Sequence, residues 1–148
     1  MGAFTFRLQP VLDMRRREEE ARGLELASAL RLLDHEQAKL TELRILEANA
    51  LAEYLKIQKE GRLDVQVIQW FQSYAMSLTV SIREQTKQIG EAQRETVRRR
   101  AALAEAARAK QGLDHLKDQA KAEHRRAEDL AEAKVIDEMA TLRHARKL

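Results

Sequence analysis

The residues that could hold a metal or transfer protons are mainly four histidines, and their spacing forms no recognised site. No two of them are four residues apart, and the chain has no HExxH motif to place two zinc ligands on one helix face. It also has no GxxxxGKS/T loop or GxGxxG turn for nucleotide phosphates. Its many carboxylates lack the burial that catalytic carboxylates need. We therefore expect no enzyme, no cofactor and no metal. The histidines are His35, His115, His124 and His144.

An aromatic cluster has the residue types of a binding surface. Trp70, Phe71 and Tyr74 lie within five residues of one another. Trp70 is about 100° from Phe71 around a helix, so the cluster is too wide for one narrow seam, and part of it should stay exposed as an interface anchor. Alternatively, Phe71 and Tyr74 close the end of a hairpin against Tyr54 and Leu51.

A run of three arginines and three glutamates offers two ion pairs at i,i+4 spacing, Arg15–Glu19 and Arg16–Glu20. With arginine first, such pairs have the weaker orientation, and each stabilises the helix by at most about 0.3 kcal/mol. The run is either a self-neutralised solvated face or a contact site.

The two chain ends are further candidates. Phe4–Phe6 precedes a predicted helix as a hydrophobic staple, a contact or a frayed end, and Asp137–Ala140 lies near the other end.

The charge balance does not favour a nucleic-acid partner. Lys and Arg number 27 against 24 Asp and Glu, a net charge of +3. The excess is densest over residues 94–110, which is either a solvated face or a surface for an acidic protein or an anionic membrane. The chain has no cysteine, no signal-peptide pattern and no apolar stretch of membrane-spanning length, so we expect a soluble cytoplasmic protein.

The composition predicts long helices. Ala, Glu, Lys, Leu and Arg make up more than half of the 148 residues, and aromatic residues only 4%. Few β-formers and turn signals argue against a β fold, and abundant charge argues against an enclosed pocket. We predict one all-α domain: a long antiparallel two-helix coiled-coil hairpin, with helix 10–60 from Pro10, turn 61–64 capped by Gly61 and Asp64, helix 65–145, and an unpaired C-terminal helical extension.

Apolar periodicity sets the expected pairing. The second helix carries a heptad stripe, and the first carries a looser one. Folding about the turn pairs Tyr54 with Phe71, Leu51 with Tyr74 and Leu43 with Ile82. The second stripe is Ile68, Phe71, Ala75, Leu78, Ile82, Gln85, Ile89, Ala92, Thr96, Arg99, Leu103, Ala106, Lys110 and Leu113. The first is Leu26, Leu30, Leu33, Leu40, Leu43, Leu51 and Tyr54.

Two features predict that the hairpin binds partners. Polar residues interrupt the seam, which fixes the register but lowers stability. Pairing outward from the turn exhausts the first helix near residue 117, so Lys117–Leu148 should have no helix beside it and should dock elsewhere. The interrupting residues are Gln37, Arg44, Gln85, Arg99 and Lys110.

Four segments in order resemble the flagellar export protein FliJ family. The opening of that family is similar to Phe6-Arg7-Leu8, Val11-Leu12 and Arg15 to Glu19 here. The family's segment after the turn is matched by Phe71, Tyr74, Leu78, Ile82 and Gln85, with the two aromatic residues in swapped order. A later stretch of the family is matched by Leu113–Lys117, and its ending by Asp137–Ala140 with Arg143 and Arg146.

The resemblance implies a non-enzymatic stalk of flagellar type III protein export. Such a stalk binds the hexameric export ATPase and promotes its assembly, links it to the membrane export gate, and escorts export chaperones. It would be cytoplasmic, at the inner face of the membrane, with no membrane insertion. By position, the gate-binding residues would be Phe71, Tyr74, Leu78, Ser81 and Gln85. The ATPase-binding residues would be Phe6, Leu8, Leu12, Arg15, Asp137, Glu138, Ala140 and Arg143.

Two other readings remain open from the residues. The chain could be a general coiled-coil scaffold or the equivalent stalk of a virulence secretion system. It could also be a basic rod on DNA or lipid, which rests only on residues 94–110.

Overall fold

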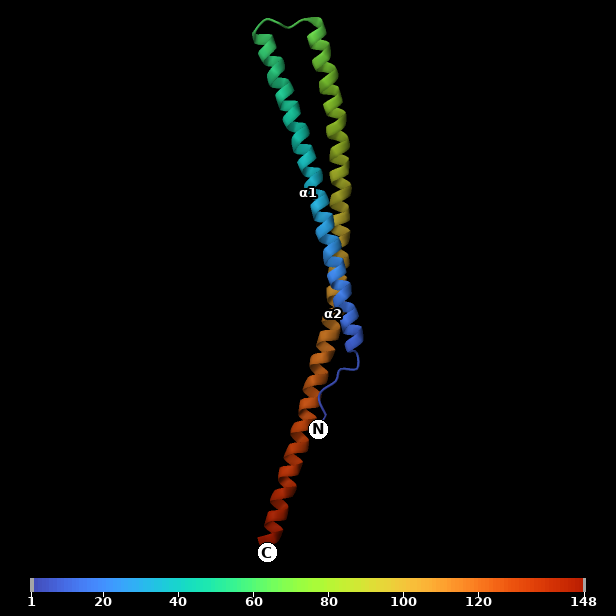
Figure 1. The fold of residues 1–148 in the computed structure, drawn as a ribbon, viewed down its shortest axis with the longest axis vertical. Helices are drawn as coiled ribbons and strands as arrows, with labels where there is room; N and C mark the ends of the chain where they lie inside the picture. The colour runs from blue at the N-terminus through green and yellow to red at the C-terminus, as the bar shows by residue number, and fades with distance from the viewer. Residues whose placement is uncertain (1, 148) are drawn as a thin grey trace. The chain divides into compact units, whose positions relative to one another are not determined.

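The chain forms two long helices in a computed structural model that describes residues 2–147. Helix α1 is Gln9–Lys59 and helix α2 is Val65–Lys147, and residues 2–147 contain no strand (Figure 1). Helix α1 starts one residue before the predicted position and stops one residue early, whereas α2 extends two residues past 145. The predicted all-α helical hairpin is confirmed. Leu148, the end of the expected extension, lies outside the described residues.

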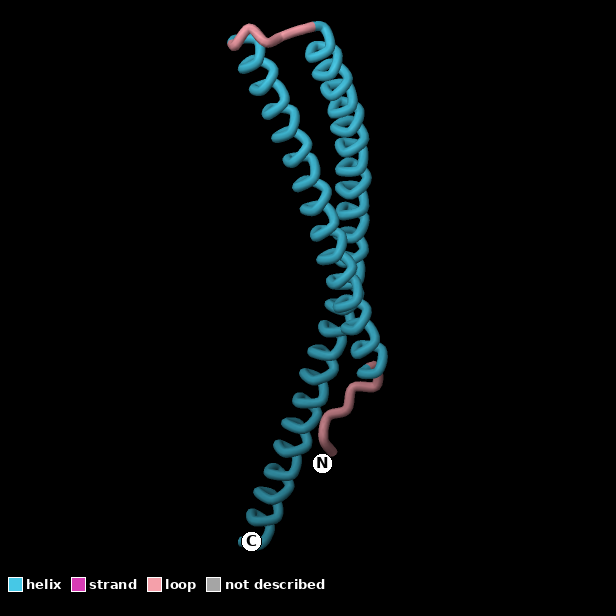
Figure 2. Tube along the Cα trace, turned by 45° about the horizontal axis from the view of Figure 1, so that its top comes forward, coloured by secondary structure: helices cyan, strands magenta, loops and turns pink. Residues whose placement is uncertain are grey.

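Contacts divide the chain into two compact units. The turn unit is Arg22–Leu103, and the terminal unit combines the chain up to Ala21 with the chain from Ala104 onward. Within the turn unit, the α1 and α2 parts run antiparallel on either side of one loop (Figure 2). None of the described helices has a stretch apolar enough to cross a bilayer.

The turn is capped at both sides as the sequence predicts. Gly61 adopts φ 70°, the left-handed conformation that favours glycine. Its N–H donates to the Gln58 carbonyl, and the Arg62 N–H donates to the Ile57 carbonyl, both at 3.1 Å. These two bonds form a Schellman motif that ends α1. Asp64 then caps α2, because its carboxylate accepts the Val67 N–H at 2.8 Å.

The stripe predicted for α2 lies in the helix–helix seam. Every one of its positions is buried or half-buried except Ala75. Leu78 is 5% exposed, Ile89 8% and Ala92 6%. Small residues recur among these buried positions, which lets the two helices approach closely.

In α1, one residue of the predicted stripe and two of the predicted polar interruptions are wrong by one position. Leu51 is 59% exposed, whereas its neighbour Ala50 is half-buried. Gln37 and Arg44 are also exposed. Their places in the seam belong to the preceding residues, Glu36 and Leu43, both of which are half-buried.

In the terminal unit, the first turns of α1 pack beside α2. Leu12 is fully buried and Ala106 is 7% exposed. Ahead of α1, the Phe4 ring lies 5.6 Å from the His124 ring, so the N-terminal segment contacts α2 and is not frayed. The region from residue 117 is therefore partly covered, although by an extended segment and not by a helix. From residue 131 onward, every described residue is exposed.

Candidate functional site

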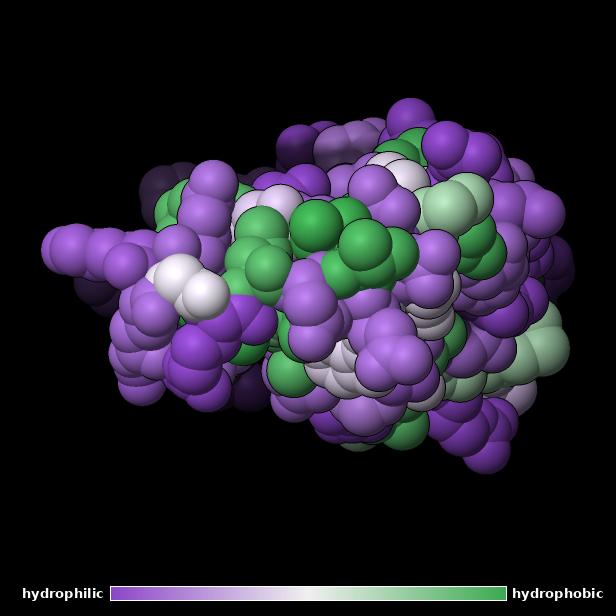
Figure 3. All heavy atoms as spheres, turned by 90° about the horizontal axis from the view of Figure 1, so that it is seen from above, coloured by the Kyte–Doolittle hydropathy of each residue, from purple (hydrophilic) through white to green (hydrophobic). Residues whose placement is uncertain are grey.

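Aromatic residues gather where the hairpin turns. Tyr54 of α1 meets Phe71 of α2 edge-on, with ring centroids 5.4 Å apart, as the pairing predicts. Trp70 stacks on Tyr74 at 5.3 Å and an interplanar angle of 15°. Trp70 is nevertheless 59% exposed, whereas Phe71 and Tyr74 are half-buried. The cluster is thus split between the seam and the surface, and apolar side chains reach the surface among polar ones at the turn end (Figure 3).

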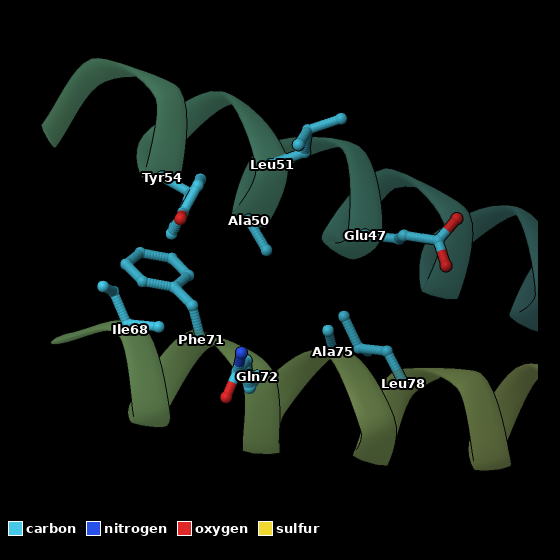
Figure 4. A pocket seen from close by; sticks show the side chains of 9 residues that line it. All are labelled: Glu47, Ala50, Leu51, Tyr54, Ile68, Phe71, Gln72, Ala75 and Leu78. Atoms are coloured by element: carbon cyan, nitrogen blue, oxygen red, sulfur yellow. The ribbon is translucent and has the colours of Figure 1, made fainter. Parts of the chain in front are cut away.

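A groove of about 390 Å³ lies between the helices beside the Tyr54–Phe71 contact. Two large rings hold the helices apart there, and the adjoining small side chains Ala50 and Ala75 do not fill the space. Figure 4 shows Ala50 directed toward α2 and Leu51 directed away from it. Leu51 therefore does not pack in the seam as predicted. The groove is lined by Glu47, Ala50, Leu51, Tyr54, Ile68, Phe71, Gln72, Ala75 and Leu78.

The remaining residues assigned to the gate lie lower on α2 and differ in accessibility. Leu78 is 5% exposed and packs in the seam. Ser81 is half-buried. Gln85 is half-buried, and its amide donates to the backbone carbonyl oxygen of Glu36 at 2.8 Å. Of the five assigned residues, Leu78 is buried and the other four are half-buried.

The polar seam residues predicted on α2 each have a partner on α1. Gln85 bonds Glu36, and the Arg99 guanidinium donates to the Glu25 carboxylate at 3.0 Å. In the terminal unit, the Lys110 ammonium lies 3.5 Å from the Glu19 carboxylate. The sequence predicted the interruptions but not these partners, since each seam glutamate looks like any other charged residue on α1. Alternating steps of four and three residues from Leu8 along α1 reach Glu19 and Glu36 but pass Glu25, which directly precedes the half-buried Leu26.

Glu25 has two arginine partners that favour its ionised form. The hydrogen bond from Arg22 is the largest effect and lowers the pKa of the Glu25 carboxyl below its ordinary value of 4.5. Burial opposes it, and the charges of Arg22 and Arg99 lower the pKa further. Arg22 is on the same helix, at 3.1 Å, and Arg99 lies across the seam. Glu25 is therefore a structural ion-pair partner.

The first four ATPase-assigned residues sit at the start of the chain. Phe6 and Leu8 are half-buried, Leu12 is fully buried and Arg15 is half-buried. Phe6 shares a shallow hollow with Lys117 of α2. These residues hold the terminal unit together.

The arginine–glutamate run does not make the predicted i,i+4 pairs. Arg15 instead pairs with Glu18 at 3.0 Å, and Arg16 lies 3.7 Å from Asp114 of α2. Glu19 faces Lys110. The run is therefore partly engaged across the seam.

The other four ATPase-assigned residues lie on the exposed end of α2. They are not in contact with the first four, because Phe4–Phe6 lies against residues 117–124, about 20 Å short of Asp137 along the helix. Large apolar side chains surround them, with Ile136 67% and Leu142 63% exposed. The four residues are Asp137, Glu138, Ala140 and Arg143.

No chemistry-bearing cluster accompanies these surfaces. Within residues 2–147, no group of three His, Asp or Glu side chains could hold a metal ion. His35, His115 and His144 are exposed, whereas His124 contacts Phe4 and lies 3.1 Å from the Glu128 carboxylate. The candidate functional features are therefore two surfaces, the aromatic cluster at the turn and the exposed end of α2.

Comparisons with known proteins agree with the fold. The family model described as "Flagellar FliJ protein" matches residues 4–148. A Chlamydia trachomatis protein described as a YscO homologue has a similar structure, with a TM-score of 0.60 and 20% sequence identity, over 96% of each chain. No curated protein is matched by the sequence.

Proposed function

Because the chain belongs to the FliJ family of flagellar proteins, we propose that it is a non-enzymatic coiled-coil stalk of the flagellar type III export apparatus. The proposal places it in the cytoplasm, at the inner face of the membrane. The match over residues 4–148 carries this assignment, since it spans both helices and the turn. A stalk needs surfaces for at least two partners, and the chain has an exposed surface in each unit.

The exposed end of α2 is proposed to bind the hexameric export ATPase. Five large apolar side chains there are more than half exposed, and exposed apolar surface of this kind is typical of a protein contact site. Asp137, Glu138, Ala140 and Arg143 lie among them and would make the polar contacts. The apolar residues are Leu130, Val135, Ile136, Met139 and Leu142.

The N-terminal residues have a supporting role in this proposal. Leu12 is fully buried, and Phe6, Leu8 and Arg15 are half-buried, so they shape the base from which the exposed helix projects.

The aromatic cluster is proposed to bind the membrane export gate. Tyr74 and Ser81 present partly exposed surface, and Trp70, stacked on Tyr74, adds an exposed ring of the kind that anchors interfaces. Phe71, Leu78 and Gln85 contribute chiefly by holding the helix pair in place. Escort of export chaperones belongs to the same proposal, and no particular surface is assigned to it.

Titration against the flagellar export ATPase tests the proposal. Added protein should raise the hexamer fraction and the rate of ATP hydrolysis. The variant Ile136→Ser/Met139→Ser tests the exposed end of α2. When this variant is added in place of the parent chain, the hexamer fraction and the rate of ATP hydrolysis should not rise. Absence of any response to the parent chain would overturn the proposal.

The equivalent stalk of a virulence secretion system is the second candidate, favoured by the fold shared with the YscO homologue. Parallel titration with a virulence secretion ATPase distinguishes the two. A stronger response of that ATPase would replace the flagellar assignment, and no response from either ATPase would leave a general scaffold.

A further inference from the structure

The side of α2 opposite the seam carries a second line of residues at heptad spacing. We call it the outer stripe: Met76, Val80, Arg83, Lys87, Gly90, Arg94 and Val97. These positions follow alternating steps of four and three residues, and all except Gly90 are exposed. Met76 is 72%, Val80 63% and Val97 68% exposed. The whole stripe lies in the turn unit and belongs to neither surface described above.

The charges of the outer stripe have one sign. It contains three cations and no acid. No carboxylate of residues 2–147 pairs with Arg83, Lys87 or Arg94, whereas the neighbouring Arg98 pairs with Glu95 at 2.6 Å. The nearest acids lie to one side of the stripe, and Glu95 is already engaged by Arg98 and Arg99. The stripe therefore offers cations that the chain itself leaves free.

The exposed side of α1 in the same unit has no such pattern. On the line of α1 that corresponds to the outer stripe, the charged residues are Arg31, Asp34 and Lys59, so both signs occur along it. A helix face that only needs to remain hydrated is satisfied by mixed charges. The single sign along the outer stripe of α2 thus needs another reason.

The spacing favours a helix as the occupant. Alternating steps of three and four residues make a narrow line that a second helix can follow for many turns, whereas a helix lying on a membrane presents a much wider apolar face with Trp, Phe or Leu. Three cations spread over residues 83–94 are also sparse for duplex DNA, which carries a phosphate charge about every 1.7 Å. Gly90, at the centre of the stripe, has no side chain of its own, and the Arg94 guanidinium reaches over it to 3.6 Å from the place a Cβ would take.

We propose that the outer stripe binds an acidic amphipathic helix of a partner protein, which packs on α2 as a third helix. Acidic side chains of the partner face Arg83, Lys87 and Arg94, and its apolar side chains cover Met76 and Val80 at one end and Val97 at the other. The partner helix covers about 32 Å, or about six turns. This inference stands independently of the ATPase and gate assignments.

The test measures binding of the full chain to a synthetic helical peptide of about 25 residues. The peptide carries leucine and glutamate at alternating three-and-four spacing, in the order that complements the stripe. A second peptide has the same composition in scrambled order. The measurement is fluorescence anisotropy at physiological salt. The patterned peptide should bind at least about tenfold more tightly than the scrambled one.

Charge reversal locates the site. The variant Arg83→Glu/Lys87→Glu/Arg94→Glu should weaken binding by at least about tenfold, since three attractive contacts become repulsive. The matched control Arg31→Glu/Lys56→Glu on α1 should change it by less than about twofold. All five positions are exposed, so helical circular dichroism should be unchanged in both variants.

Three results would overturn the proposal: no peptide binding at physiological salt, equal binding of the scrambled peptide, or equal losses in the two variants. Phosphatidylglycerol–phosphatidylcholine vesicles and a DNA duplex serve as competing probes. If either binds more tightly than the patterned peptide, and the stripe variant abolishes that binding, the stripe is a lipid or nucleic-acid surface and the helix proposal fails.

Discussion

The side chain of Gln85 hydrogen-bonds Glu36 twice across the seam, at 2.8 Å to the backbone carbonyl oxygen and at 2.5 Å to the carboxylate. The Glu36 side chain is only 14% exposed, so it depends on this donor more than a surface carboxylate would. Sliding one helix past the other would place the amide of Gln85 opposite an apolar residue. The pair therefore fixes the register in which the helices display their outward surfaces.

Removing this contact should destabilise the hairpin. We expect Gln85→Ala to lower the free energy of unfolding by about 1–2 kcal/mol, because the Glu36 carboxylate loses its cross-helix donor while remaining mostly buried. Urea unfolding followed by circular dichroism measures the change. Gln88→Ala is the control, since Gln88 bonds only Glu84 of its own helix, at 3.3 Å. Equal losses in the two variants would contradict the role given to Gln85.

The two neighbouring aromatic residues should separate stability from binding. Phe71→Ala should cost about 1–3 kcal/mol of unfolding free energy, because it removes the ring packed against Tyr54. Trp70→Ala should lower the free energy of unfolding by less than about 1 kcal/mol, since most of that ring is exposed. Its loss of binding free energy for the gate protein should be larger than this loss of stability. Thermal unfolding and calorimetric titration with the gate protein measure the two effects. Greater destabilisation by Trp70→Ala would reverse our division of the cluster.

The ion pairs of Glu25 predict a dependence on pH. Arg22 and then Arg99 lower the pKa of the folded-state Glu25 carboxyl below 4.5, so its pairs contribute stability above the unfolded-state pKa. That contribution is lost as the pH falls through the folded-state pKa. Glu25→Gln should therefore lower the Tm at neutral pH and change it little in strong acid.

The control for this prediction is Glu20→Gln, an exposed carboxylate on the same helix. The Tm of Glu20→Gln should stay close to that of the parent chain from neutral pH to strong acid. Because Glu25 remains accessible to solvent, high salt should reduce its effect at neutral pH. A Tm difference for Glu25→Gln that grows on acidification would have the wrong sign for the proposed pairs.

Deleting residues 131–148 should remove binding without unfolding the hairpin. Residues 131–147 are all exposed, so the deletion exposes little core, and the unfolding free energy should change by less than about 1 kcal/mol. Binding to the export ATPase should be lost. Sedimentation with the ATPase and urea unfolding measure the two quantities on the same protein. A truncated chain that still binds the ATPase would place the contact elsewhere.

Most of the fold could be predicted from α2, because its heptad repeat keeps apolar or small residues at nearly every seam position. Leu78, Ile89 and Ala106 are all where that repeat puts them. Gly61 and Asp64 likewise marked the turn, since a left-handed cap and an N-cap need those residue types.

The seam of α1 was harder to predict because leucine occurs on several of its faces. Leu24 is 72% exposed and Leu51 59% exposed, while glutamates at positions 19 and 36 face the partner helix. Hydrophobicity alone therefore selects the wrong residues by one position. A glutamate of α1 can be recognised as a seam residue only when its partner on α2 is known. The sequence of α1 alone does not identify that partner.

The functional surfaces were likewise predictable only in part. The cluster of Trp70, Phe71 and Tyr74 is too wide for one narrow seam, which predicted an exposed aromatic residue, and Trp70 is exposed. The contact of Phe4 with His124 could not be predicted, because an extended segment has no periodicity that identifies what it packs against.

The most direct test of the account compares two variants against two partners. Calorimetric titration would measure the affinity of Trp70→Ala, and of the chain lacking residues 131–148, for the gate protein and for the export ATPase. We predict that Trp70→Ala weakens only gate binding and that the truncation weakens only ATPase binding. Equal effects of either variant on both partners, or no effect of either, would contradict separate binding surfaces on the two units.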